Sequence, residues 1–323
     1  MYDEPILLIT FNRPLHVRRV LKEILGVSPR DLYVFQDGPR VENADDCINC
    51  KLVRDTVETM VSSSETQLHT YYSNVNLGCG PGPAAGISWF FENVEQGIII
   101  EDDAVPNSDF FYYAKELLNR YKENSDVRAI GSMKIDSEQH GTGSYYFSRV
   151  NRNLCAWATW RRAWKDFDIH MANVSAKQLN SALKHYGCKL REREFWLDRL
   201  KEVHYDGIGG SSWDMQFFMS IWVHGGKGIM PNVNLCSNIG FDSEGTHTTE
   251  TDNVAANVPT AGILPLVHPN NENIDRRADF LFHKLYFTPY QYGMEGLRRL
   301  PYRMNRRLKR LVGHEGPWIK KNK

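Results

Sequence analysis

The chain has 323 residues, of which 41% are hydrophobic and 24% are charged, as in an ordinary globular protein with a sizeable core. Lys plus Arg and Asp plus Glu number 39 each, so no overall positive field favours nucleic acid as a partner. No apolar run approaches the ~20 residues that a membrane-spanning helix needs, and the acidic start of the chain does not resemble a signal peptide. These features predict a cytoplasmic protein.

The first 130 residues alternate between apolar runs and helical patterns. Runs that predict buried strands lie at 5–11, 31–38, 67–73 and 97–103, and helical spacing is found at 14–25, 47–61, 87–94 and 108–124. This alternation predicts βαβ units and an α/β fold with a mainly parallel, Rossmann-like sheet flanked by helices.

The second half is less regular and predicts a mixture of helices and isolated strands. Strands are expected at 145–148 and 228–231, and helices near 175–186, 190–203 and 212–224. The polar, proline-bearing stretch from 246 to 269 predicts a long loop of the kind that often covers a binding site.

Three consecutive acidic residues, Glu101, Asp102 and Asp103, follow the apolar run of the fourth predicted strand. Ligands of parallel sheets bind beyond the carboxyl ends of the strands, where these acids are expected to lie. Adjacent carboxylates supply the hard oxygen ligands that Mg²⁺ and Mn²⁺ prefer, and Mg²⁺ commonly bridges one or two of them to substrate phosphates. The acids alone leave two interpretations open, a solvated strand end and a divalent-metal site.

The motifs around these acids resemble those of a known enzyme family. ILLITFNRP, FQDG and NLGCGPGPAAGISWFFENVEQGIIIEDDAVP, followed in order by AWATWRRAWKDFD, SSWDMQF, NLCSNIGFDSEGTHT and LVHP, are similar to motifs of nucleotide-diphosphosugar transferases of the GT-A fold. The resemblance is greatest to the bacterial glycosyltransferase-2-like proteins often labelled hemolytic-protein-like sugar transferases, and N-acetylglucosaminyltransferase I is a more distant relative. It covers residues 5 to 285.

The resemblance implies a GT-A glycosyltransferase domain over 1–290 and a basic tail over 291–323. Within the domain, about 1–130 would bind the nucleotide sugar and 131–290 would carry the acceptor side. The implied activity is metal-dependent, inverting transfer of a sugar from a nucleotide-diphosphosugar, with a UDP-sugar favoured, to an acceptor hydroxyl. Mn²⁺ or Mg²⁺ is the implied cofactor, and synthesis of a bacterial surface polysaccharide such as capsule, O-antigen or lipopolysaccharide is the implied setting.

The resemblance also assigns roles to the acids at the end of the fourth strand. Asp103 resembles the last acid of the DxD-type motif and would ligate the metal. Glu101 and Asp102 would contact the ribose or support the metal's coordination shell.

Three earlier residues are similar to the family's nucleotide-binding positions. Asp37 resembles the acid that contacts the nucleotide base, and Thr10 and Arg13 belong to the opening loop around the nucleotide and its phosphates. Each has an ordinary structural alternative, since Asp37 before Gly38 can simply form a turn and Arg13 can be a surface charge.

Asp214 is the candidate catalytic base. Ser211 or Ser212 is expected to cap a helix, which puts Asp214 in its first turn, where the positive end of the helix favours a carboxylate. By the resemblance, Asp214 would deprotonate the acceptor hydroxyl as it attacks the anomeric carbon. An ordinary first-turn acid is the alternative, and Met215 stands where the more distant relative has a second aspartate.

Other residues carry weaker functional signals. His247, in the long polar loop, would contact the diphosphate or the metal by the resemblance, although a solvated histidine is the alternative. Trp157 or Trp160 could stack on a sugar ring, whereas Trp164 is expected in the core. The adjacent pair Arg161–Arg162 could bind phosphate or lie on the surface.

One departure from the family favours a different function. The family often has a basic residue after the LGC stretch, where this chain has Gly80, Pro81, Gly82 and Pro83. The alternative is therefore a catalytically inactive nucleotide-sugar-binding or scaffold protein of the same fold. A metal-dependent phosphohydrolase would need a second cluster of acids and histidines, which the sequence does not offer.

The end of the chain is strongly basic. From Arg298 to Lys323 there are ten Lys or Arg and one acid, a net charge of 10 − 1 = +9, so the other residues carry 29 − 38 = −9. A solvated flexible end is one interpretation. The other is peripheral attachment to the inner face of the cell membrane, at ~1 kcal/mol per basic residue, which would suit a lipid-linked saccharide acceptor.

Overall fold

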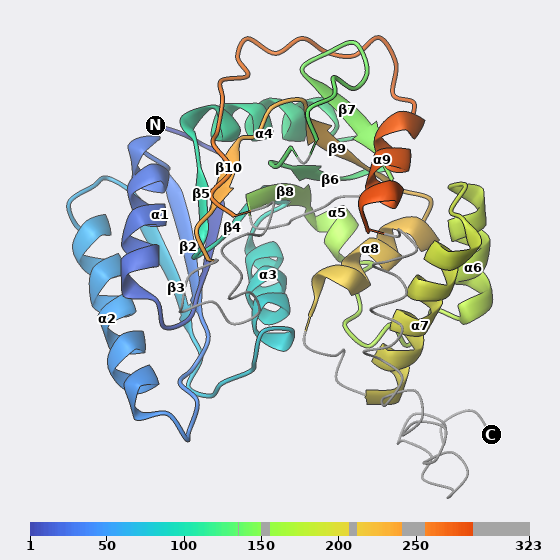
Figure 1. The fold of residues 1–323 in the computed structure, drawn as a ribbon. Helices are drawn as coiled ribbons and strands as arrows, with labels where there is room; N and C mark the ends of the chain where they lie inside the picture. Colours follow the sequence, from blue (N-terminus) through green and yellow to red (C-terminus); the bar gives the residue numbers. More distant parts are fainter. Residues whose placement is uncertain (135, 150–155, 207–211, 241–255, 287–323) are drawn as a thin grey trace, which may run out of the picture.

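A computed structural model of the chain describes residues 1–134, 136–149, 156–206, 212–240 and 256–286 (Figure 1). Its main sheet has eight strands, which in their order across the sheet are β3 (Gln67–Tyr72), β2 (Asp31–Gln36), β1 (Ile6–Thr10), β4 (Gln96–Glu101), β8 (Ala156–Trp160), β6 (Val127–Gly131), β9 (Lys227–Pro231) and β7 (Tyr145–Ser148). A small second sheet pairs β5 (Ala104–Pro106) with β10 (Cys236–Asn238).

The described helices lie between and around these strands. They are α1 (Pro14–Gly26), α2 (Ala44–Val61), α3 (Pro81–Asn93), α4 (Ser108–Arg120), α5 (Arg161–Trp164), α6 (Ala176–His185), α7 (Leu190–Asp206), α8 (Asp214–Val223) and α9 (Arg276–Tyr286). None of them is long and apolar enough to cross a bilayer. Helix α3 begins at Pro81, earlier than the expected start at Ile87, because proline fits the first turn of a helix.

The strands β3, β2, β1 and β4 are parallel neighbours, and β6 and β9 are also parallel. Strands β8 and β7 run antiparallel to the strands beside them. The predicted α/β fold, a mainly parallel sheet flanked by helices with a less regular second half, is therefore confirmed.

Each face of the sheet is covered by an apolar core. Ile6 and Leu8 of β1 pack into a core with α1, α2 and α4, whereas Leu7 and Ile9 pack into a second core with α3 and α8. Figure 1 shows α1 and α2 on one side of the sheet and α3 on the other. Burial on both faces explains why the strands appear in the sequence as continuous apolar runs.

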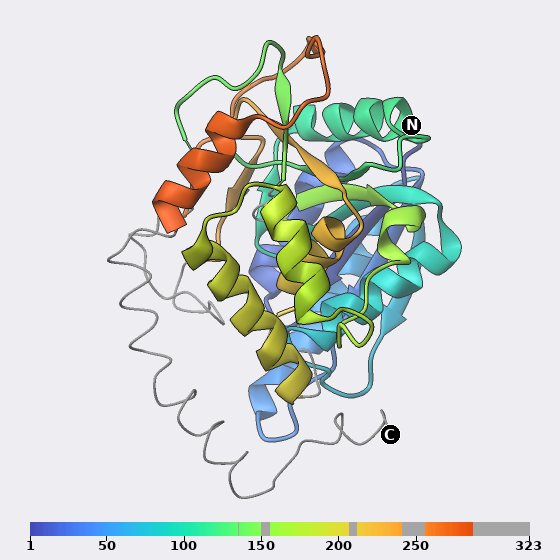
Figure 2. The ribbon, with the colours of Figure 1, turned by 90° about the vertical axis from the view of Figure 1, so that its right-hand side faces the viewer.

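The second half of the chain adds a group of helices beside the sheet. Figure 2 shows α6 and α7 packed side by side, and both contact α8. Trp222 of α8 and Trp196 of α7 meet edge to face at 4.7 Å between ring centroids, which fixes the two helices together.

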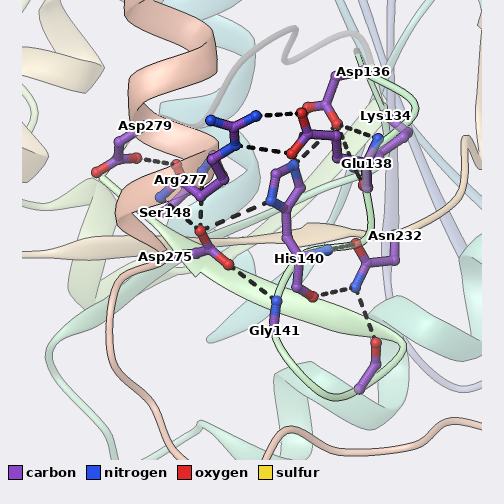
Figure 3. Close-up of polar contacts among 12 residues, drawn as sticks. Lys134, Asp136, Glu138, His140, Gly141, Ser148, Asn232, Asp275, Arg277 and Asp279 are labelled. Atoms are coloured by element: carbon purple, nitrogen blue, oxygen red, sulfur yellow. Dashed lines mark hydrogen bonds and ion pairs between the residues drawn. The ribbon is translucent and has the colours of Figure 1, made fainter.

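Polar contacts hold α9 against the loop that precedes β7 (Figure 3). Asp275, just before α9, accepts from the backbone N–H of Gly141 at 3.0 Å and from that of Arg277 at 2.9 Å. The fully buried ring of His140 contacts Asp136 at 3.0 Å, and Arg277 pairs with Glu138 at 2.7 Å. These contacts join the last described helix to a loop far away in the sequence.

Candidate functional site

The carboxyl ends of β1, β2 and β4 meet at one edge of the sheet. Thr10 lies opposite Gln36, and Ile9 lies opposite Glu101, so the loops that follow the three strands begin side by side. These loops carry Arg13, Asp37 and the two aspartates after Glu101. The fold thus brings the predicted donor-side residues to one edge, which is where ligands of open α/β sheets bind.

Arg13 is the positive charge that faces the acidic residues. Its Nη2 donates to Asp102 Oδ1 at 2.7 Å and its Nη1 donates to Asp103 Oδ2 at 3.3 Å. Only 15% of the Arg13 side chain is exposed, so it is not simply a surface charge. Arg13 precedes Pro14, the first residue of α1, and this short turn directs its guanidinium to the sheet edge.

Two carboxylate oxygens at this edge are buried without a hydrogen bond. Within the described part of the chain, Asp102 Oδ2 and Asp103 Oδ1 have no partner. Buried polar atoms are rarely left unsatisfied, so both oxygens are available to a cation or to a hydrogen-bond donor.

Negative charge accumulates here beyond what Arg13 neutralises. Burial, and then the charges of Asp103, Asp102 and Asp214, raise the pKa of Glu101 well above its usual range. Burial also raises the pKa of Asp102 to about 6, although the Arg13 guanidinium opposes the shift. A second cation at this edge would favour the ionised carboxylates.

The residues present fit a divalent cation held by few protein ligands. Among the residues that the structure describes, no three His, Cys, Asp or Glu side chains converge as a complete ligand set. Asp103 and Asp102 nevertheless each offer one buried oxygen that is not hydrogen bonded. Mg²⁺ usually takes one or two protein carboxylates and completes its shell with water and phosphate oxygens. This edge therefore suits an ion shared with a diphosphate, and it does not form a closed cage.

Asp103 is held in position by the second half of the chain. Its carbonyl oxygen accepts from the backbone N–H of Ile239 at 2.8 Å, next to the pairing of Ala104 with Asn238 between β5 and β10. A Cβ added to Gly240 would lie 2.2 Å from Asp103 Oδ2, so no larger residue fits unless Asp103 moves.

Asp37 is largely buried and binds the turn that precedes α3. Its Oδ1 accepts from the backbone N–H of Gly38 at 2.9 Å and of Leu77 at 2.8 Å. Its Oδ2 accepts from Gly78 N at 2.9 Å and from Asn76 Nδ2 at 3.2 Å. Burial raises the pKa of Asp37, while the backbone hydrogen bonds lower it. Both carboxylate oxygens of Asp37 are thus hydrogen bonded within the protein. The predicted contact of Asp37 with a nucleotide base stays a prediction.

The side chain of Thr10 also makes a hydrogen bond within the protein. Its side chain is buried, and its hydroxyl donates to the carbonyl of Phe35 at 3.0 Å. The predicted contact with a nucleotide therefore depends on the remaining lone pairs of the hydroxyl oxygen or on the backbone.

Asp214 is the first residue of α8, as expected, but the helix is not capped as predicted. The N-cap residue is Trp213, which makes no side-chain cap hydrogen bond. The hydroxyl of Ser212 instead donates to Asp214 Oδ1, which also accepts from the backbone N–H of Met215 at 2.9 Å. The predicted cap at Ser212 is wrong, and Ser211 lies outside the described residues.

The start of α8 is anchored to the sheet by aromatic packing. Trp213 stacks on Trp157 of β8, with 5.6 Å between ring centroids and 25° between ring planes. Because the charge of Asp214 contributes to the raised pKa of Glu101, the candidate base lies within electrostatic reach of the last residue of β4. The donor-side acids and the candidate base therefore share one region of the molecule.

The predicted stacking of Trp157 or Trp160 on a sugar is wrong. The two side chains are 0% and 2% exposed, and the indole N–H of Trp160 donates to the carbonyl of Leu118 at 3.1 Å. Trp164 lies in the core, as expected. All three tryptophans are used for packing.

The pair Arg161–Arg162 is also structural. Arg162 donates to the carbonyls of Tyr121 and Val127, both at 2.9 Å, and Arg161 pairs with Glu95 at 2.5 Å. Neither guanidinium is directed to the edge that carries the acids, so the predicted phosphate contact is not supported.

Two predicted features lie outside the described residues. His247 falls within 241–255, and the basic tail falls within 287–323. Their proposed contacts with the diphosphate and with a membrane stay predictions.

Some site features were not predicted from the sequence. The contact of Arg13 with both aspartates depends on side-chain direction, and no local pattern signals it. Gly240 carries a weak signal, a lone glycine two residues after β10. The Ser-Trp-Asp spacing that brings Ser212 onto Asp214 is a second weak signal.

Comparisons with known proteins find similarity of fold only. No family model and no curated protein matches the chain. Among solved structures, residues 1–349 of S. aureus TarS are similar at 12% identity and a TM-score of 0.36, over 52% of this chain and 50% of that chain. HddC from Yersinia pseudotuberculosis is similar at 12% identity and a TM-score of 0.32, over 52% and 80%. A UDP-glucose pyrophosphorylase is similar at 8% identity and a TM-score of 0.32, over 51% and 78%.

The chain therefore spans about half the length of the TarS chain that it matches. Similarity this partial assigns no substrate and no reaction, so the function has to be argued from the residues at the sheet edge.

Proposed function

We propose that the chain is a metal-dependent, inverting glycosyltransferase that moves a sugar from a nucleotide-diphosphosugar, with a UDP-sugar favoured, to an acceptor hydroxyl. One observation carries the proposal. Asp102 and Asp103 each present a buried oxygen without a partner beside Arg13, and Asp214 lies within electrostatic reach. Diphosphate binding and deprotonation of a hydroxyl need this combination of charges.

On the donor side, Asp103 would hold the cation, with Asp102 beside it, and Arg13 would contact the diphosphate. Mn²⁺ or Mg²⁺, when bound, would neutralise charge that develops on the leaving diphosphate. Asp37 keeps the turn before α3 closed, and Thr10 ties β1 to β2, so both would shape the walls around the nucleotide. In this proposal, residues 1–130 form the donor half and 131–290 the acceptor half.

On the acceptor side, Asp214 would take the proton of the attacking hydroxyl. The contacts from Ser212 and from the backbone N–H of Met215 both use Oδ1. Oδ2 is therefore the atom that we assign to the proton. Trp213, fixed on Trp157, would keep this carboxylate from swinging away when the acceptor binds.

The alternative is a catalytically inactive nucleotide-sugar-binding or scaffold protein of the same fold. Two observations favour it. The start of α3 at Gly80–Pro83 supplies no basic side chain, and both oxygens of Asp37 are already hydrogen bonded within the protein. Such a protein would bind a donor without turning it over.

We propose synthesis of a bacterial surface polysaccharide as the setting. The strongly basic segment from Arg298 to Lys323 would attract the protein to the anionic inner face of the cell membrane. A lipid-linked saccharide would then be a suitable acceptor.

Isothermal titration with a panel of UDP-, GDP-, CMP- and dTDP-sugars, with and without Mn²⁺, tests these functions. We expect a UDP-sugar to bind only with the metal and to be transferred, or slowly hydrolysed when no acceptor is present. Binding without either reaction would favour the inactive alternative. Failure of every nucleotide sugar to bind would contradict both functions.

A further inference from the structure

Arg13 is shared unequally between two aspartates. Its bond to Asp102 Oδ1, at 2.7 Å, has the length of a good charge-assisted hydrogen bond. Its contact with Asp103 Oδ2, at 3.3 Å, is beyond the ordinary range for an N–H donor. Arg13 therefore holds Asp102 firmly and Asp103 loosely.

The loosely held carboxylate is also the more accessible one. The side chain of Asp103 is 16% exposed and that of Asp102 is 5% exposed. Each aspartate also keeps one buried oxygen without a hydrogen bond among the described residues, Oδ2 in Asp102 and Oδ1 in Asp103, so the exposure of the side chains is what separates them. A cation from solvent would thus meet Asp103 first, and there it would face the positive guanidinium already in contact with the same carboxylate.

We propose that Arg13 is an internal counter-cation that competes with the divalent metal for Asp103, and that it pivots on Asp102 toward the donor's diphosphate once the metal binds. This inference rests on the proposed function. The inference is that Arg13 sets the affinity for the metal. The proposed function is that the bound donor then transfers its sugar to an acceptor.

Elementary electrostatics supports the exchange. A guanidinium stays charged at all physiological pH values, so it cannot leave the acids by losing a proton and has to move. When a metal takes Asp103, repulsion between the two cations favours release of the longer contact, and the shorter bond to Asp102 keeps Arg13 nearby. The released Nη1 can then donate to a phosphate oxygen, which a planar guanidinium binds well.

The exchange predicts coupling between metal and donor. Without a donor, Arg13 opposes the metal; with a diphosphate present, Arg13 has another anion to contact and opposes it less. Metal and donor would therefore each increase the affinity for the other, as linkage requires.

Mn²⁺ binding to the full chain tests the proposal, by isothermal titration and by the electron paramagnetic resonance of free Mn²⁺. Without nucleotide, Arg13→Ala should bind Mn²⁺ about three- to tenfold more tightly than wild type, because the competing cation is gone. With saturating Mn²⁺, the same variant should bind UDP more weakly. Arg13→Gln, which keeps volume and hydrogen-bond donors, gives the same expectation if the alanine variant does not fold.

Arg128→Ala is the matched control. Arg128 is 12% exposed and pairs with Asp166 at 2.7 Å on a different part of the sheet. Arg128→Ala should leave the affinities for Mn²⁺ and for UDP unchanged. If this variant changes them as Arg13→Ala does, the effect comes from the loss of any buried arginine, and the proposal is overturned.

A double-mutant cycle with Asp102→Asn tests the pivot. Asp102→Asn removes a carboxylate beside the metal, so it should weaken Mn²⁺ binding in both backgrounds. The loss should be larger in the wild-type background, because there the change also frees Arg13 to bind Asp103 fully. Equal effects in the two backgrounds would overturn the pivot, and unchanged or weaker Mn²⁺ binding by Arg13→Ala would overturn the competition. If wild type binds UDP equally well with and without Mn²⁺, the proposed metal-dependent function is wrong instead.

Discussion

Gly240 lies so close to Asp103 that a Cβ added to the glycine would come within 2.2 Å of the carboxylate oxygen Oδ2. Gly240→Ala should therefore turn Asp103 away from its present position without disturbing either core. We expect Mn²⁺-dependent binding of a UDP-sugar to weaken roughly tenfold or more, because a displaced ligand reduces metal affinity. Isothermal titration measures the loss, and thermal unfolding checks that the fold is retained.

Gly262→Ala is the control for this change. A Cβ at Gly262 would lie 3.4 Å from Asp109 Oδ2, an ordinary van der Waals distance to a carboxylate of the same kind. It should leave donor binding unaltered. Wild-type affinity in the Gly240 variant would contradict a metal-binding role for Asp103.

Variants at Asp103 and at Asp214 are predicted to lose different steps, donor binding in the first case and sugar transfer in the second. Asp103→Ala should abolish metal-dependent donor binding, since it removes the proposed ligand. Asp214→Asn should bind the donor as wild type does and lose transfer by about 10²- to 10⁴-fold, the usual effect of removing a general base. Titration calorimetry and transfer rates separate the two effects, and near-normal turnover of the Asp214 variant would reject its assignment as the base.

Much of the fold was predictable because buried strands appear in the sequence as runs of apolar residues. The runs at 6–9 and 98–100 are continuous and apolar because β1 and β4 are covered on both faces. Parallel strands then end at one edge, so the proximity of Thr10 and the acids after β4 follows from the strand order alone.

Side-chain contacts over long sequence separations were less predictable. Arg13 and Asp103 are 90 positions apart, and the direction of each side chain depends on packing that no local pattern reports. Trp157 and Trp160 illustrate a second limit, since an aromatic residue that would stack on a sugar and one that fills a core look the same in sequence. The cap expected at Ser212 failed because its hydroxyl binds the nearby carboxylate of Asp214 instead of a helix N–H.

Asp37 is predicted to contribute to stability as well as to binding. Asp37→Ala would leave the partly buried backbone N–H groups of Leu77 and Gly78 without their acceptor. We expect the free energy of unfolding to fall by about 1–3 kcal/mol, measured by urea denaturation. Asp55→Ala, which removes an exposed pair with Lys51, should change it by less than about 0.5 kcal/mol. Equal stability of the two variants would mean that the hydrogen bonds of Asp37 do not stabilise the fold, so that this side chain would serve ligand binding only.

The basic segment is predicted to bind anionic membranes. Removal of 298–323 takes away ten basic residues and one acid, and it should release the protein from vesicles that contain phosphatidylserine. Co-sedimentation at low and high salt measures the effect, because screening should weaken only the electrostatic part. Donor binding in solution should be unchanged, and equal vesicle binding by the shortened chain would contradict attachment through this segment.

Asp279 is predicted to make stability depend on pH through burial. Its Oδ1 accepts from the hydroxyl of Ser148 at 2.9 Å, and Arg149 lies 3.3 Å from its Oδ2. Burial raises the pKa of Asp279 from 3.8 to about 6, although Arg149 opposes the shift. Between these two values the folded state keeps the proton that the unfolded state loses, so the contribution of this group to stability falls as the pH rises.

Asp279→Asn cannot titrate, so it isolates this effect. The free energy of unfolding of wild type minus that of the variant should decrease by about 2–3 kcal/mol between pH 3.5 and pH 7, with most of the change between the two pKa values of 3.8 and about 6. Urea denaturation across the pH series measures it, with Asp55→Asn as an exposed control whose difference should stay nearly constant. A flat difference would show that folding leaves the pKa of Asp279 unchanged. A difference that increases with pH would show that its pairing with Arg149 outweighs its burial.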